Sequence, residues 1–218
     1  MAERTRRNVR VPRPPVRPPP VPSRVLRNRR GPTPPDAIVN ALTAAYVADP
    51  ESNTGTWISA LLLAMHALNV KARREVGRSG VDVPAELPDD PDTVNWMSEL
   101  SFGVGQRQGA GWTLAAILAW IANFTRAGFV KRVRYYALAG GSEGYIWSTL
   151  LDAKVRPRHV ELEGTYHKWS EPPVSGSNGF RGHCGEPGGC RCFCWPLPSP
   201  RGNKSVESTG VAKLPRSD

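Results

Sequence analysis

Residues 112–151 read WTLAAILAWIANFTRAGFVKRVRYYALAGGSEGYIWSTLL, and the change of pattern inside this stretch decides the fold class. In its first part, apolar side chains recur at every fourth position: Trp112, Ala116, Trp120 and Phe124. This is the spacing of one helical face, so we predict a helix over 112–127 that ends at Gly128. From residue 129 onward, short segments rich in aromatic and β-branched residues favour strands instead.

Upstream of this stretch the sequence predicts three further helices, over 34–48, 56–76 and 92–104. The first follows the segment TPPD, which offers a hydroxyl cap at Thr33 and prolines for the first turn. The second carries apolar residues at helical spacing: Trp57, Leu61, Met65 and Leu68. We expect the first two helices to pair as a hairpin and Asp92 to cap the third.

Downstream, four segments bounded by Gly, Pro or charged residues are predicted to be strands. They are FVKRVRYYAL (129–138), GYIWSTLL (144–151), GTYHKW (164–169) and CRCFCW (190–195). The predicted fold class is therefore α+β. A helical region, 33–128, precedes a small irregular domain with antiparallel strands, 129–198.

Both ends of the chain differ in composition from this body. Residues 1–32 alternate Arg with Pro, and residues 199–218 have few apolar side chains, so neither segment can bury enough surface to fold. We predict a disordered basic arm and a flexible tail. The net charge is +10, and residues 1–35 carry ten Arg against one Glu, which leaves the rest of the chain close to neutral.

A basic arm on a neutral body predicts a polyanionic partner for the arm alone. Because arginine binds phosphates through a bidentate fork, nucleic acid is the first candidate. The alternative is a solvated tail that keeps the protein soluble. The candidate nucleic-acid-binding residues are Arg4, Arg6, Arg7, Arg10, Arg13, Arg17, Arg24, Arg27, Arg29 and Arg30.

The sequence predicts a soluble protein made in the cytosol, without a membrane partner. Its first residues, MAERTRRNVRVPRPP, lack the apolar core of a secretory signal, and their prolines would break the helix of a transit peptide. The longest apolar stretch, 57–70, is interrupted by polar residues and is shorter than the about 18 residues of a membrane span. His66, inside that stretch, is assigned no role.

All four cysteines lie close together: Cys184, Cys190, Cys192 and Cys194. The reducing cytosol argues against disulfides, and strand alternation would point the last three to one face. Two interpretations stay open. In one, the thiols are small buried hydrophobes. In the other, zinc is bound by Cys190 and Cys192, completed by His159 with either His183 or Cys184.

The run WSTLLDAKVRPRHVELEGTYH (147–167), followed by PGGCRCFCWP (187–196), resembles the Mu F-type phage head morphogenesis family. In that family a Trp-bearing strand leads to an Asp and then to an Arg-containing turn, which has either two Cys or the variant Val-Arg-Pro-x-His. A Leu-x-Gly segment and a Cys-Arg-Cys strand follow. The loop GHCGEPGGC departs from the family's His-Pro-Asn-Cys by adding Cys184 and placing its histidine at His183. The matching residues are Trp147, Asp152, Val155, Arg156, Pro157, His159, Leu162, Gly164, Cys190, Arg191 and Cys192.

The resemblance implies a minor head protein of a tailed bacteriophage, assembled in the host cytoplasm and present in the virion head. Its expected partners are the portal protein, the major capsid or scaffolding protein, and phage DNA. The alternative is a zinc-containing DNA-binding regulatory protein, which would need a basic folded surface. The sequence shows no nucleophile with a neighbouring base and no phosphate loop, so we predict no enzyme. Asp152 and Arg156 are expected to form an ion pair that closes their turn.

Overall fold

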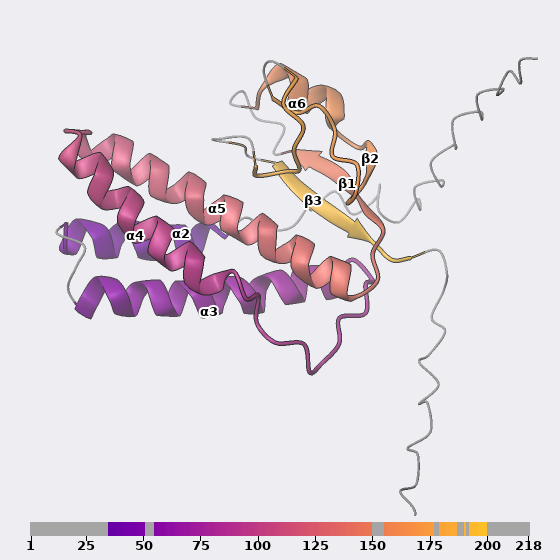
Figure 1. Cartoon of the computed structure of the whole chain (residues 1–218), viewed down its shortest axis with the longest axis horizontal. Coiled ribbons are helices and arrows are strands. Elements are labelled where there is room, and N and C mark those ends of the chain that lie inside the picture. Colours follow the sequence, from indigo (N-terminus) through magenta and orange to yellow (C-terminus); the bar gives the residue numbers. More distant parts are fainter. Residues whose placement is uncertain are drawn as a thin grey trace, which may run out of the picture.

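The computed structural model describes residues 35–50, 55–149, 155–176, 179–186, 190 and 192–199. Over these residues the chain forms five helices and one three-stranded antiparallel sheet, which confirms the predicted α+β class (Figure 1). The predicted arm 1–32, the cap at Thr33 and the tail beyond Ser199 lie outside the described residues. The elements are α2 (Asp36–Ala48), α3 (Gly55–Arg78), α4 (Thr93–Gly109), α5 (Leu114–Ala139), β1 (Gly144–Thr149), α6 (Pro157–Leu162), β2 (Tyr166–Lys168) and β3 (Cys192–Leu197).

The four long helices pack on one another, and α5 contacts α2, α3 and α4 (Figure 1). The predicted pairing of the first two helices is confirmed, because α2 packs on α3 with the rings of Tyr46 and Trp57 at 5.9 Å edge to face. The buried face of α3 includes Leu61 and Leu68, as its apolar spacing predicts. None of the described helices has the length and apolar character needed to cross a bilayer.

The prediction that a helix ends at Gly128 and a strand follows is wrong. Helix α5 continues without a break to Ala139. Its buried residues beyond the predicted end include Phe129, Val133 and Tyr136, which are spaced by four and three as on one helical face. Aromatic and β-branched residues favour strands only weakly, and burial at helical spacing outweighs that preference here.

Two other boundaries also differ from the predictions. Helix α4 runs to Gly109 instead of ending near residue 104, and Asp92 occupies its N-cap position without a side-chain cap bond. The Asp92 carboxylate instead accepts a hydrogen bond from Asn95, at 3.3 Å. Trp112 precedes α5, whose N-cap is Thr113, so this side chain is 47% exposed and does not belong to the helical ridge.

Gly128 marks a close approach of α4 and α5. A methyl group added there would collide with the indole of Trp96 and approach the guanidinium of Arg132 to 3.1 Å. We expect Gly128→Ala to lower the free energy of unfolding by about 1–3 kcal/mol, because overpacking forces these side chains to move. The measurement is urea denaturation. Gly105→Ala in α4 is the control, because nothing lies within 4 Å of the added group, and its expected effect is neutral or stabilising.

The sheet has the order β2-β1-β3, with both neighbours antiparallel to β1. It lies against the C-terminal half of α5, which contacts β3 (Figure 1). One continuous hydrophobic core includes Leu42 of α2, Phe129 of α5 and Trp147 of β1. The predicted boundary between 128 and 129 therefore falls inside α5, and the helices and the sheet share a core.

Candidate metal centre

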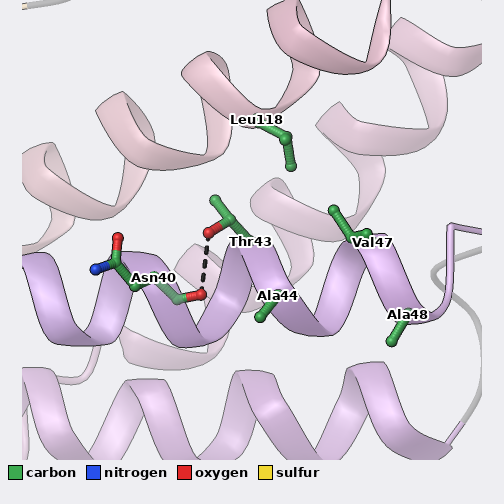
Figure 2. Close-up of a pocket in the computed structure, with 6 residues that line it drawn as sticks. All are labelled: Asn40, Thr43, Ala44, Val47, Ala48 and Leu118. Atoms are coloured by element: carbon green, nitrogen blue, oxygen red, sulfur yellow. Dashed lines mark hydrogen bonds between the residues drawn. The ribbon is translucent and has the colours of Figure 1, made fainter.

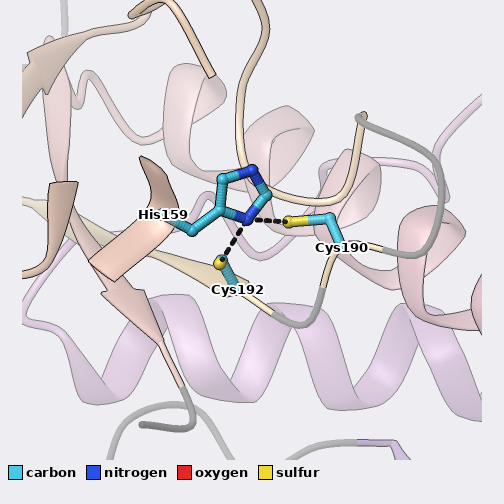
Figure 3. Close-up of side chains that lie close together, drawn as sticks. All are labelled: His159, Cys190 and Cys192. Carbon is cyan, nitrogen blue, oxygen red and sulfur yellow. Dashed lines mark hydrogen bonds between the residues drawn. The ribbon is translucent and has the colours of Figure 1, made fainter. Parts of the chain in front are cut away.

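Three of the predicted metal ligands meet in one buried cluster: His159, Cys190 and Cys192 (Figure 3). The His159 Nδ1 atom lies 3.3 Å from the Cys192 sulfur and 3.6 Å from the Cys190 sulfur. The three donor atoms all lie within 4.8 Å of one another. Each of the three residues is at most 5% exposed. The cluster could hold a metal ion.

Two elements from distant parts of the sequence build this cluster. His159 lies on α6, which starts with Pro157, a residue whose fixed backbone angle suits the first helical position. Helix α6 packs on β1, and Cys192 begins β3, where it pairs with Thr149 of β1. The central strand thereby aligns the histidine helix with the cysteine strand.

A backbone carbonyl fixes the tautomer of His159. Its Nε2 atom lies 2.8 Å from the carbonyl oxygen of Ser175, and a carbonyl can only accept, so Nε2 carries the proton. The Nδ1 lone pair therefore faces the two sulfurs. Ser175 is itself held in place, because its hydroxyl donates to Gly182 O at 2.9 Å and its N–H donates to Phe180 O at 2.9 Å. A histidine ligand with its second nitrogen donating to a carbonyl is the usual arrangement at metal sites.

The thiols of Cys190 and Cys192 are hydrogen-bonded to each other. A hydrogen bond from Cys192 and the backbone N–H groups of Gly185 and Cys192 lower the pKa of Cys190 to about 6, against the opposing effect of burial. The same hydrogen bond raises the pKa of Cys192, which keeps the shared proton. The Cys192 thiol therefore donates its hydrogen bond to the Cys190 sulfur. A metal ion would displace the remaining proton, since cysteine binds metals as the thiolate.

Trp147 covers the cluster from β1. Its side chain is fully buried, and its ring lies 5.4 Å from the His159 ring in an edge-to-face arrangement. The indole Nε1–H has no well-aligned hydrogen-bond partner, yet the indole lies close enough to Cys192 to oppose the rise of its pKa. A buried N–H donor beside a sulfur favours the sulfur in its negatively charged, metal-binding form.

The other two predicted ligands lie outside this group. His183 Nδ1 is 3.0 Å from the Tyr145 hydroxyl, and the Cys184 thiol is hydrogen-bonded to Cys194. Burial raises the pKa of the Cys184 thiol. No sequence signal indicates the carbonyl of Ser175 or the N–H of Gly185, because every residue type except proline carries both backbone groups.

His167 of β2 gives the C-terminal unit a pH dependence. Burial lowers its pKa, and electrostatic repulsion from a protonated His183 lowers it further. As pH falls, the unfolded chain therefore binds this proton first, so stability is fully present above about pH 6.5 and is lost below it. We expect the urea midpoint to drop between about pH 7 and pH 5, and to drop less in His167→Gln. An equal pH dependence in both proteins would contradict this.

Apart from this cluster, a concave surface feature lies between α2 and α5 (Figure 2). This open groove, of about 470 Å³, is lined by small apolar and neutral side chains, and the Thr43 hydroxyl in it donates to the Asn40 carbonyl at 3.0 Å. None of its lining residues is titratable. The lining residues are Asn40, Thr43, Ala44, Val47, Ala48 and Leu118.

Of the motif residues that the structure describes, Trp147 packs on the cluster of His159, Cys190 and Cys192, and Gly164 hydrogen-bonds to Trp147. Leu162 is buried, and Gly164 has a φ of 73°, in the left-handed region that favours glycine. Asp152 and Arg191 lie outside the described residues, so the predicted ion pair of Asp152 with Arg156 stays a prediction. Comparison with known proteins found no family model, no curated protein and no solved structure that matches this chain.

Proposed function

We propose that this chain is a minor head protein of a tailed bacteriophage, acting in head morphogenesis near the portal or inner shell. The observation that supports it is the convergence of the motif residues. The Trp147 N–H donates to Thr165 O at 2.9 Å, and its carbonyl accepts from the Gly164 N–H at 2.8 Å. His159 reaches the cysteine strand beside the same tryptophan. A motif that arose by chance would have no reason to gather at one point.

In this proposal the chain acts by binding and not by turnover. The C-terminal unit, from β1 to β3, is the docking module for the portal, capsid or scaffolding protein. The arm 1–32 binds packaged DNA through its arginines. The module stays rigid because a metal ion joins α6 to β3 at the cluster of His159, Cys190 and Cys192.

We further propose that this ion is zinc. Two thiolates and one imidazole are a ligand set that zinc prefers, and zinc needs no redox partner. A tetrahedral zinc with Zn–S of about 2.3 Å and Zn–N of about 2.0 Å places the nitrogen and sulfur about 3.5 Å apart. The 3.3 and 3.6 Å separations at His159 Nδ1 agree with this geometry.

Elemental analysis tests the metal. Full-length protein purified under reducing conditions without a chelator should contain one zinc ion per chain. The proposal is wrong if the purified protein contains no metal and takes up none on titration with zinc. The cluster would then be two buried thiols beside a structural histidine.

Mass spectrometry of purified procapsids and mature heads tests the head assignment. The wild-type protein should be present in one or both. Its absence from both particles would overturn the proposal, and a zinc-containing DNA-binding regulatory protein would then be the better reading of the basic arm and the metal cluster.

Gly164→Val should exclude the protein from heads while leaving it soluble. The left-handed backbone at Gly164 costs a side chain with a Cβ about 1–2 kcal/mol, and more for a β-branched one. The turn that carries the Trp147 hydrogen bonds would then be distorted. Gly164→Asn is the matched control, because asparagine tolerates this conformation. Normal incorporation of the valine variant would show that this turn plays no part in docking.

A further inference from the structure

The metal cluster supplies three donors, but structural zinc sites are four-coordinate. From β1 to β3, the described residues include three further buried His or Cys side chains that could complete it: His183, Cys184 and Cys194. All three are buried. The contacts of these three side chains differ, and they favour one of the three as the fourth ligand. The inference below rests on the zinc site proposed above.

His183 is committed to other partners. Its Nδ1 atom lies 3.0 Å from the Tyr145 hydroxyl, and its ring also hydrogen-bonds the backbone of Trp169. A carbonyl can only accept, so the nitrogen facing Trp169 carries the proton and Nδ1 accepts from Tyr145. Moving this ring to a metal would leave the buried Tyr145 hydroxyl without a partner, at a cost of about 1–3 kcal/mol.

Cys194 is too far along its strand. It follows Cys192 by two residues in β3, so the two Cα atoms lie about 7 Å apart. Two sulfurs on one tetrahedral zinc must approach to about 4 Å. Cys190 is also two residues from Cys192, but it precedes β3, so strand pairing does not fix its spacing, and its thiol hydrogen-bonds to Cys192. Cys194 instead lies inside β3, where it pairs with Trp147 of β1.

Cys184 lies on a turn that already touches the cluster. The N–H of Gly185, the next residue, donates to the Cys190 sulfur. Gly185 has a φ of 81°. An added Cβ at this position would lie 3.1 Å from Val130, so the turn packs directly on α5. Backbone N–H groups commonly donate hydrogen bonds to metal-bound thiolates. The Cys184 thiol is hydrogen-bonded to Cys194, and rotation about one bond would release it.

We propose that Cys184 is the fourth ligand, which makes the site one of three cysteines and one histidine and clamps the 182–186 turn to β3. On binding, Zn²⁺ takes up three thiolates and the Nδ1 lone pair of His159, and the protons of those thiols leave to solvent. The centre then carries one net negative charge. The N–H groups of Gly185 and Trp147 face the sulfurs and stabilise that charge.

Cobalt substitution of the full-length protein tests this ligand set. The sulfur-to-Co²⁺ charge-transfer band grows with the number of bound thiolates, so Cys184→Ala should lose about a third of its intensity, from three thiolates to two. Cys194→Ala is the matched control, a buried thiol two residues beyond Cys192, and should keep the full band. Full intensity in Cys184→Ala, or the loss in Cys194→Ala instead, would overturn the proposal.

A second measurement needs no variant. X-ray absorption at the zinc edge of the wild-type protein should fit three sulfurs at about 2.3 Å and one nitrogen at about 2.0 Å. A fit with two sulfurs would reject Cys184 as a ligand but keep the zinc site. Wild-type protein that binds neither zinc nor cobalt would reject the metal site itself. If the site is correct, the wild type binds the metal and Cys190→Ser loses that binding.

Discussion

Removal of the metal ion should lower the melting temperature of the protein by about 10 °C. An ion present at about 1,000 times its dissociation constant stabilises the folded chain by about 4 kcal/mol. For a chain of this size each kcal/mol corresponds to about 2–4 °C. In the proposed site the ion joins α6 to β3, and the strands around it form a sheet of only three strands among the described residues. Calorimetry with and without a chelator measures the change.

His159→Gln should show the low melting temperature without any chelator and should not respond to one. The glutamine cannot supply the Nδ1 lone pair that faces both sulfurs. His66→Gln is the matched control, because His66 is exposed on α3 and lies outside the metal group. It should keep the chelator response. A chelator response that persists in His159→Gln would place the ion somewhere else in the protein.

The sequence predicted correctly those elements in which the spacing of the apolar residues matches the buried face. Helix α3 was predicted within two residues at each end, because its apolar spacing is the spacing of its buried face. The segment 129–138 was misassigned because its aromatic and β-branched residues suit a strand, while Phe129, Val133 and Tyr136 occupy one face of α5. Only the packing of this face against the core decides between the two.

The candidate site was predicted as a set of residue types but not as a geometry. Cys190, Cys192 and His159 were singled out by their chemistry and by the family resemblance, and the structure brings them together. The tautomer of His159 depends on the carbonyl of Ser175, which every residue type possesses. The sequence therefore could not show that Nδ1, and not Nε2, faces the sulfurs.

The proposed docking module shares its hydrophobic core with the helical region. Helix α5 crosses the predicted domain boundary and contacts both the other helices and β3. Cutting the chain at residue 128 would expose Phe129, Val133 and Tyr136 at once. The helical region is thus part of the scaffold that holds the metal cluster, and the experiments above use the full chain for this reason.

Trp147→Ala should be among the most destabilising single substitutions in the C-terminal unit. The side chain is fully buried in the core, and truncating a buried tryptophan costs about 3–5 kcal/mol. It also removes the ring that packs against His159 at 5.4 Å. Urea denaturation of the variant should show a loss of this size, and its zinc content should fall with it.

Trp147→Phe separates packing from hydrogen bonding. The smaller ring keeps most of the apolar contact, so the loss of stability should stay below about 1.5 kcal/mol, as for other conservative core replacements. The indole N–H beside Cys192 is gone, however, and loss of such a partner weakens metal binding by about 10–100-fold. Competition with a fluorescent zinc chelator measures the affinity.

Trp195→Phe is the matched control for this prediction. Trp195 is also on the sheet and also has a buried indole N–H without a partner. It follows Cys194 directly in β3, so its side chain points to the opposite face of the strand from Cys192 and Cys194. Its replacement should leave the zinc affinity unchanged. Equal affinity in Trp147→Phe and the wild type would mean that the indole N–H does not act on the sulfur, and that Trp147 serves the site through packing alone.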